Sequence, residues 1–157
     1  MSEIELREED STILNSDVVQ LCGFRIDEDY YAISVLEVQE VIRKQMLTKI
    51  PCAPEYIKGL INLRGQIVTA LSLRKLFDLP EMDTTEYMNI IVRSGDSLYA
   101  LMVDEILDVM NFQQSTFEKT PENLNDKVAH YINGVYKLEG RLLIILDLTK
   151  VLSQEIK

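Results

Sequence analysis

The sequence has no tryptophan, a single histidine, His130, and only two cysteines, Cys22 and Cys52, in 157 residues. No serine or cysteine motif accompanies His130, so nucleophilic catalysis would require pairing it with one of the two cysteines. Phosphate-binding motifs of the forms G-x-x-x-x-G-K and G-x-G-x-x-G are also missing. These absences argue against an enzyme, although a small cytoplasmic enzyme stays open as an alternative.

Long hydrophobic runs are missing as well. The longest run covers residues 98–103, whereas about 20 apolar residues are needed to cross a bilayer. The first ten residues, MSEIELREED, are acidic and contain no apolar stretch, so they do not resemble a secretion signal. We therefore expect a soluble cytoplasmic protein, without membrane insertion, whose thiols are reduced. A disulfide between Cys22 and Cys52 is the open alternative.

Basic residues are in deficit, with 16 Lys and Arg against 26 Asp and Glu and a net charge of −10. This balance argues against nucleic acid as a partner, because phosphate binding depends on clustered cations. Four basic residues do gather locally, which indicates a protein contact: Lys58, Arg64, Arg74 and Lys75. Asp104, Glu105 and Asp108 are spaced too loosely for a calcium loop and lack its glycine. We interpret these three acids as a solvated face and expect neither a metal nor a cofactor.

A repeated hairpin motif dominates what is present. Residues 59–77 read GLINLRGQIVTALSLRKLF, in which two apolar runs flank Arg64-Gly65-Gln66. The pattern predicts two antiparallel strands joined by a tight turn, with Asn62 and Gly65 shaping the turn and Arg64 displayed at its tip. Residues 134–152 repeat the motif at an offset of 75, with Glu139 in place of Arg64.

The first halves of the two copies also match, because residues 31–42 resemble residues 99–110 at an offset of 68. A short polar insertion within residues 111–129 accounts for the difference between the offsets. Strands are predicted at residues 18–26 and 30–34, a capping box at Ser34 and Glu37 before a short helix or strand end, and one helical turn at 73–77. Closely spaced short strands predict a mostly β protein of two small, packed barrels with few helices.

The predicted organisation is a flexible acidic tail at residues 1–17 followed by a single domain, residues 18–157. Within the domain, residues 18–80 form the first barrel repeat and residues 85–157 the second, and exchange of strands between the repeats stays open. The polar stretch with Pro80 marks the boundary between them.

The hairpin and its surroundings resemble the signature of the CheW family of bacterial chemotaxis coupling proteins. The resemblance is carried by PEYIKG at residues 54–59, NLRG at 62–65 and QIV at 66–68, and it extends over about residues 18–152. It implies a fold of two five-stranded SH3-like barrels and a non-catalytic adaptor. Such adaptors couple the cytoplasmic tips of membrane chemoreceptors to the regulatory domain of the histidine kinase CheA, in receptor arrays at the inner membrane.

Carried over by motif position, the resemblance implies a receptor-facing groove. Its residues are Val35, Val38, Glu40, Gly59 and Arg64, with Met88 and Val109 across the boundary between repeats. The bottom-up alternative for Val35 and Val38 is a place in the core, and for Arg64 and Glu40 a solvated charge. The chain departs from the family pattern at Thr69 and Ser72, where the family usually has proline and aspartate.

Two other functions stay open. The first is an adaptor of the same family in a non-flagellar pathway, such as surface motility or gene expression. The second is suggested by residues 142–147, where an apolar run before Asp147 imitates a phospho-accepting receiver. The duplication disfavours a receiver, because it places Asp147 opposite Ser72 in a hairpin return strand.

Overall fold

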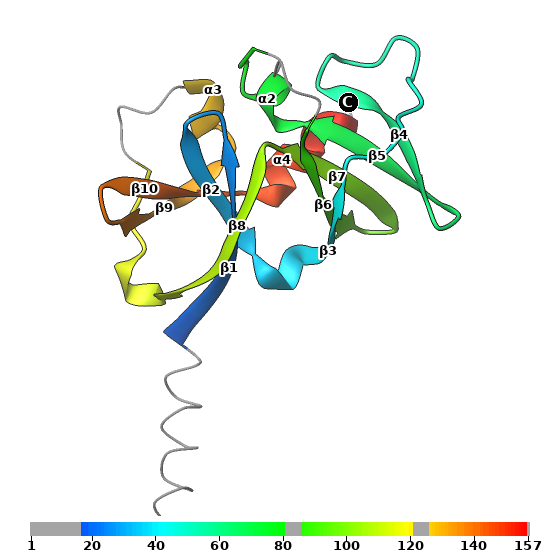
Figure 1. Ribbon diagram of the computed structural model, residues 1–157. Coiled ribbons are helices and arrows are strands. Elements are labelled where there is room, and N and C mark those ends of the chain that lie inside the picture. Colours follow the sequence, from blue (N-terminus) through cyan, green and yellow to red (C-terminus); the bar gives the residue numbers. More distant parts are fainter. Residues whose placement is uncertain (1–16, 81–85, 121–125, 157) are drawn as a thin grey trace, which may run out of the picture.

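The computed structural model of the protein describes residues 17–80, 86–120 and 126–156 (Figure 1). The predicted tail, apart from Asp17, and most of the stretch after Pro80 lie outside these residues. Ten strands form two five-stranded sheets. In spatial order, sheet A contains β8 (Glu105–Gln113), β1 (Val18–Ile26), β2 (Asp29–Ser34), β10 (Arg141–Leu146) and β9 (Ile132–Leu138). Sheet B contains β3 (Val38–Arg43), β6 (Met88–Ser94), β7 (Ser97–Val103), β5 (Gln66–Ser72) and β4 (Ile57–Leu63).

In the part of the chain that the structure describes, helical segments are short and few. Two 3₁₀ turns, η1 (Val35–Glu37) and η2 (Gln114–Thr116), accompany the α-helices α2 (Leu73–Leu76), α3 (Asp126–Ala129) and α4 (Leu148–Ile156). The prediction of a mostly β protein with two five-stranded units and few short helices is therefore confirmed. The strands at residues 18–26 and 30–34 and the turn of helix after Ser72 are also where the sequence predicts them.

The sheets do not divide at residues 80–85, because each combines strands from both sequence repeats. Sheet A takes β1 and β2 from the first repeat and β8, β9 and β10 from the second, while sheet B holds the remaining five strands. The strand registers follow the internal duplication. Val68 of β5 lies opposite Leu98 of β7 in a parallel pair, and the equivalent residues Leu143 and Tyr30 lie opposite each other in sheet A. The two sheets are thus copies of one arrangement.

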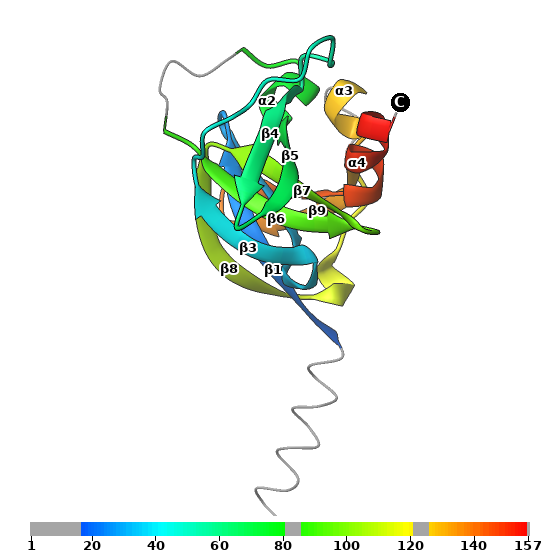
Figure 2. The ribbon, with the colours of Figure 1, turned by 90° about the vertical axis from the view of Figure 1, so that its right-hand side faces the viewer.

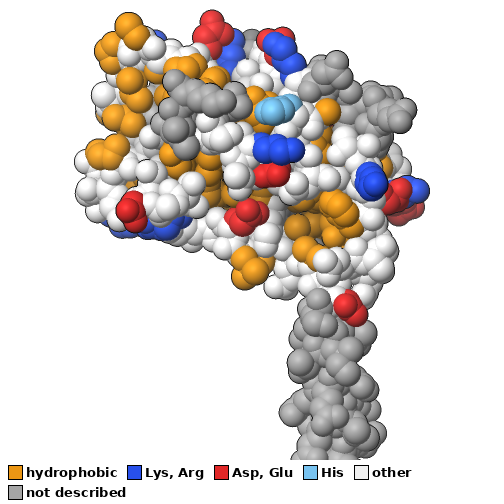
Figure 3. Space-filling view, turned by 180° about the vertical axis from the view of Figure 1, so that it is seen from behind, with side chains coloured by type: hydrophobic (Ala, Val, Ile, Leu, Met, Phe, Trp, Pro, Cys, Tyr) orange, Lys and Arg blue, Asp and Glu red, His pale blue; other side chains and the backbone are white. Residues whose placement is uncertain are grey.

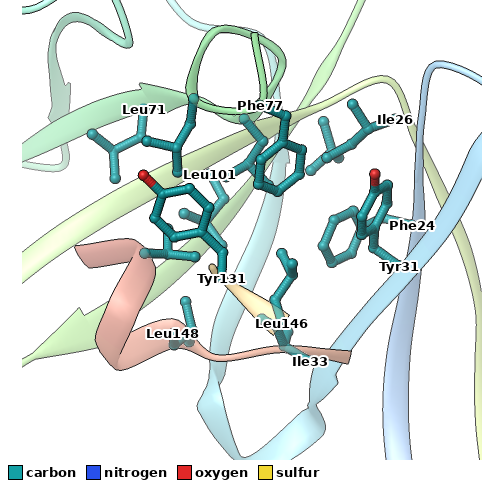
Figure 4. Packing of buried hydrophobic residues seen from close by; sticks show 14 of the residues in the cluster. Phe24, Ile26, Tyr31, Ile33, Leu71, Phe77, Leu101, Tyr131, Leu146 and Leu148 are labelled. Atoms are coloured by element: carbon teal, nitrogen blue, oxygen red, sulfur yellow. The ribbon is translucent and has the colours of Figure 1, made fainter. Parts of the chain in front are cut away.

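Three apolar clusters hold the sheets together. A central cluster lies between them and contains Phe24, Tyr31, Phe77 and Tyr131 in successive ring contacts (Figure 4). Each sheet has in addition a cluster of its own. Successive side chains of a strand point to opposite faces, so a strand that serves two clusters must be apolar on both. This explains continuous apolar runs such as Ile90 to Val92 in β6, all three fully buried.

The α4 helix packs into the central cluster between the two sheets (Figure 1). Leu148, Val151 and Leu152 recur at helical spacing and are buried there. Asp147 precedes this helix, and its side chain accepts a hydrogen bond from the Lys150 backbone N–H at 3.2 Å. Asp147 therefore caps a helix, and β10, which leads into it, pairs antiparallel with β9. Among the helices that the structure describes, none is long and apolar enough to span a membrane.

Candidate functional site

The hairpin tip of sheet B displays Arg64. The Leu63–Gln66 pair closes a two-residue turn in which Arg64 has φ of 50° and Gly65 of 85°. Positive φ at both positions defines the type I′ turn that suits the right-handed twist of paired strands. The Asn62 side chain accepts a hydrogen bond from the Gly65 N–H at 2.9 Å. These contacts confirm the predicted hairpin and leave the Arg64 side chain 68% exposed.

Arg64 forms an ion pair with Glu40 of β3, through its Nη2 and the carboxylate Oε2. In sheet B, β3 and β4 occupy opposite edges, so this pair connects the hairpin tip with the far edge strand. The arginine lies on the surface and is not buried in an internal ion pair. A guanidinium has five N–H donors, and Glu40 uses only part of this capacity, so Arg64 can contact a further acceptor.

Most of the predicted partner-binding residues belong to sheet B, which faces the viewer in Figure 2, or to the turns that adjoin it. Val38 and Met88 pack against the central cluster between the sheets. Val35 in η1 and Val38 and Glu40 in β3 are partly exposed, and Met88 of β6 pairs with Arg43 at the end of β3. We name Val35, Val38, Glu40 and Arg64 together the β3 surface. The capping box predicted at Ser34 is present, because its hydroxyl accepts the Leu36 N–H and the Glu37 carboxylate accepts the Ser34 N–H. This cap holds the turn that leads into β3.

Two of the predicted residues lie apart from the β3 surface. Val109 is exposed but belongs to β8 at the edge of sheet A. Gly59 is buried, and its φ of 146° brings the Thr48 carbonyl so near that an added Cβ would lie 2.6 Å from that oxygen. Thr48 and Leu60 exchange backbone hydrogen bonds of 2.8 and 2.9 Å at this place. Gly59 therefore shapes the β4 edge, and any effect of this residue on a partner is indirect.

An ion-pair network at the boundary between the sheets was not predicted. We name it the Asp104 network; its members are Arg25, Asp27, Arg74, Asp104 and Glu105. Arg74 Nη2 lies 2.7 Å from Asp104 Oδ2, the Asp27 backbone N–H donates to the same carboxylate, and Arg25 Nε donates to Glu105 at 3.0 Å. The hydrogen bonds that Arg74 donates to the Asp104 carboxylate raise the pKa of the guanidinium, and burial acts in the opposite direction.

Two expectations are wrong at this network. Asp104 does not belong to a solvated face, because its side chain is only 3% exposed. Arg74 is not available for a protein contact, since its guanidinium is turned inward and also donates to the Pro80 carbonyl at 2.8 Å. The sequence does contain a signal for the Arg74–Asp104 pair. Asp104 is a charged residue directly after β7 and Arg74 is a charged residue in α2, and the topology brings these two elements together.

Outside the network, charges and apolar groups alternate on the surface. On the face seen in Figure 3, hydrophobic side chains form several separate areas with charged side chains between them. Within the described residues, no three His, Cys, Asp or Glu side chains are grouped so that they could hold a metal ion.

Comparisons with known proteins identify the family to which this fold belongs. The model of the CheW-like domain matches residues 20–155. The chain is 36% identical over 133 residues to the chemotaxis protein CheW of Bacillus subtilis, covering 84% of this chain and 85% of that protein. It is 32% identical to CheW of Treponema pallidum, covering 90% and 86%. The crystal structure of the scaffolding protein CheW from Thermoanaerobacter tengcongensis superposes with a TM-score of 0.74 at 28% identity, covering 82% of this chain and 88% of that chain. The chain therefore belongs to the CheW-like family, whose members are non-enzymatic scaffolding proteins of chemotaxis signalling.

Proposed function

We propose that the protein couples the cytoplasmic tips of chemoreceptors to the regulatory domain of the histidine kinase CheA. The observation that carries this proposal is the combination of family membership with an exposed arginine held on a stiff hairpin. A scaffold of this kind acts by geometry. Two partners bound to separate surfaces of one rigid body are held at a raised effective concentration, so a conformational change in one can bias the other.

The β3 surface is the proposed receptor site. Chemoreceptor tips are helical, and a helix binds by laying its apolar face into a groove. Val35 and Val38 would supply the apolar area for such a contact, because both are partly exposed, and Arg64 would supply a directional cation at its rim. Because the guanidinium is planar and carries several donors, it can bind a partner carboxylate or carbonyl while the contact to Glu40 keeps it in position.

The direct test of this proposal is a titration of Arg64→Ala with a soluble receptor fragment and, separately, with the kinase regulatory domain. We expect receptor binding to weaken by about 2 kcal/mol, roughly thirtyfold, as for an anchor residue. Glu139→Ala is the matched control, because Glu139 occupies the same turn position in the equivalent hairpin of sheet A. Wild-type affinity for both partners in Arg64→Ala would remove this residue from the site.

Glu40 is expected to set partner choice. A charge at the edge of an interface affects specificity and association rate more than affinity, and the ion pair of Glu40 with Arg64 supports a position at that edge. Glu40→Lys should therefore change which receptors are recovered in pull-downs from the same cells. An unaltered set of receptors would show that this carboxylate only orients Arg64.

A further inference from the structure

The internal duplication allows each side of the molecule to be compared with its own copy. Residues of the first repeat correspond to residues of the second at offsets of 68 before the hairpin and 75 within it, and the strand registers obey the same correspondence. The Asp104 network lies at one boundary between the sheets. The equivalent positions lie at the other boundary between the sheets, where different types of residue occupy them.

At the second boundary the buried pair is replaced by uncharged residues. Leu36 corresponds to Asp104, and Thr149 corresponds to Arg74. Arg93 and Glu37 correspond to Arg25 and Glu105, which form an ion pair of 3.0 Å in the network. Within the described residues no ion pair joins Arg93 to Glu37, and Arg93 Nε donates to the Gln39 side chain at 3.4 Å.

The space vacated by the missing pair is an open hollow of about 520 Å³. We name it the Leu36 hollow. Its apolar wall is formed by Val38, Leu148 and Leu152, and its polar wall by Glu37, Arg93 and Thr149. Partial burial raises the pKa of Glu37, the hydrogen bond from the Ser34 N–H acts in the opposite direction, and the nearby Asp147 carboxylate raises it further. The Glu37 carboxylate therefore lies in a setting where a new cation would be favourable.

Leu36 stands beside this hollow as an exposed apolar side chain. It is 93% exposed, and the capping box fixes its backbone, since the Leu36 N–H donates to the Ser34 hydroxyl at 3.1 Å. A single exposed leucine needs no explanation by itself. Here, however, a rigidly presented apolar side chain lies beside a hollow that has one apolar and one polar wall. A surface of this shape can be complementary to itself.

We propose that the Leu36 hollow is a dimerisation site, in which Leu36 of each copy enters the hollow of a second copy around a twofold axis. In such an interface every contact occurs twice, with residue i of one copy facing residue j of the other and the reverse. Arg93 of each copy then meets Glu37 of the partner copy. This restores, between molecules, the type of arginine–glutamate pair that Arg25 and Glu105 make within one molecule.

The charges on the polar wall favour a second copy over an unrelated partner. The wall carries one cation, Arg93, and one anion, Glu37, so a uniformly acidic or basic segment would place a like charge against one of them. A second copy related by a twofold axis places a charge of opposite sign against each of these two residues. Because the hollow is small and open, the interface belongs to the class of small, transient contacts, and association should be weak and reversible.

Dimerisation would also cover part of the β3 surface. Val38 lines the Leu36 hollow and belongs to the proposed receptor site, so the dimer and the receptor complex would exclude each other. This consequence rests on the proposed function, whereas dimerisation itself does not. Measurements of mass without any partner therefore test the dimer independently of receptor or kinase binding.

The first experiment is sedimentation velocity of the full chain from about 5 µM to about 500 µM, the range in which weak interfaces associate. We expect the average mass to rise from the monomer value of 18.1 kDa and to level off at twice that value. Leu36→Glu should remain monomeric throughout. Met46→Glu is the matched control and should associate like the wild type, because Met46 is 91% exposed but lies outside the hollow.

The second experiment uses the twofold symmetry itself. In Arg93→Glu alone and in Glu37→Arg alone, both intermolecular pairs would become like-charge contacts, so each variant should be monomeric. In an equal mixture both pairs are again of opposite sign, and a heterodimer should form with at least a tenfold gain in association over either variant. A wild type that stays at 18.1 kDa, association that Leu36→Glu leaves intact, or a mixture without a heterodimer would each overturn the proposal.

Discussion

The Arg74 guanidinium holds the Asp104 carboxylate in a bidentate pair, with Nε 3.0 Å from Oδ1 and Nη2 2.7 Å from Oδ2. Arg74 belongs to α2, which follows sheet B, and the same carboxylate accepts the Asp27 backbone N–H from the β1–β2 turn of sheet A. One buried carboxylate thus connects both sheets. Since the β3 surface is carried by sheet B and Val109 by sheet A, the network helps to fix their relative positions.

Removing the Asp104 carboxylate should destabilise the fold strongly. Asp104→Ala leaves Arg74, whose side chain is only 14% exposed, without its main counter-charge, and the Asp27 N–H without its acceptor. Breaking a buried ion pair from one side costs about 3 to 5 kcal/mol, and we expect about 3 kcal/mol here because Arg25 is closer to solvent. Urea unfolding followed by circular dichroism measures the change in the midpoint.

Asp108→Ala is the control for this change. Asp108 lies on β8, is exposed, and belongs to the same acidic stretch of sequence. Substitutions of this kind usually change stability by less than about 0.5 kcal/mol. Equal midpoints for the two variants would mean that the Asp104 network is no more important than a surface charge.

Gly59 and Gly65 should respond differently to the same substitution. In Gly59→Ala the added Cβ would meet the Thr48 carbonyl oxygen at 2.6 Å, at a φ of 146°, so strain and overlap together should cost about 3 kcal/mol. In Gly65→Ala the Cβ has nothing within 4 Å, and only the left-handed conformation is penalised, by about 1 kcal/mol. Thermal unfolding of both variants compares the two costs directly. A smaller loss in Gly59→Ala than in Gly65→Ala would show that the Thr48 segment moves away at little cost.

The two thiols should differ in reactivity. Cys52 is exposed on the loop before β4, whereas Cys22 is buried in β1, and burial raises the pKa of the Cys22 thiol. Since the thiolate is the reactive form, a disulfide reagent should modify about one thiol rapidly and the second only after denaturant is added. Cys52→Ser should remove the rapid phase. Two rapid thiols in the native protein would contradict the burial of β1.

Local features of this fold were predictable because their causes are local. The type I′ turn follows from Gly65 between two apolar runs, and the capping box follows from the spacing of Ser34 and Glu37. The duplicated hairpin was visible because its apolar positions recur at a constant offset. Each of these features depends on residues that are neighbours in the chain.

Features that depend on distant residues were not predictable in the same way. The two repeats exchange their first two strands, because β1 and β2 join β8, β9 and β10 while β6 and β7 join β3, β4 and β5. An apolar pattern along one strand does not say which strand lies beside it. Asp104 and Arg74 are 30 residues apart, so their charges look solvated until the topology brings them together. Gly59 was assigned to a partner surface by resemblance, whereas its position beneath Thr48 is seen only in three dimensions.

Asn89 marks a position where the two copies differ in the core, and the duplication suggests how to improve it. Asn89 is fully buried, its Nδ2 donates to the Arg43 carbonyl at 3.2 Å, and its Oδ1 has no hydrogen-bond partner among the residues that the structure describes. The equivalent residue in sheet A is Leu21, which is also buried. Removing a buried acceptor without a partner and adding apolar area should both stabilise the fold. Because Arg43 is exposed, water can replace the lost donor at its carbonyl.

We therefore expect Asn89→Leu to raise the free energy of unfolding by about 1 kcal/mol, measured by urea titration against the wild type. Asn62→Leu makes the same chemical change at a site where the amide is used, because its Oδ1 accepts the Gly65 N–H at the hairpin tip. That variant should lose about 1 kcal/mol, so the two substitutions should shift the midpoint in opposite directions. If both lower it, the Asn89 amide contributes more through the Arg43 carbonyl than its unpartnered oxygen costs, and the leucine of sheet A is not a guide to sheet B.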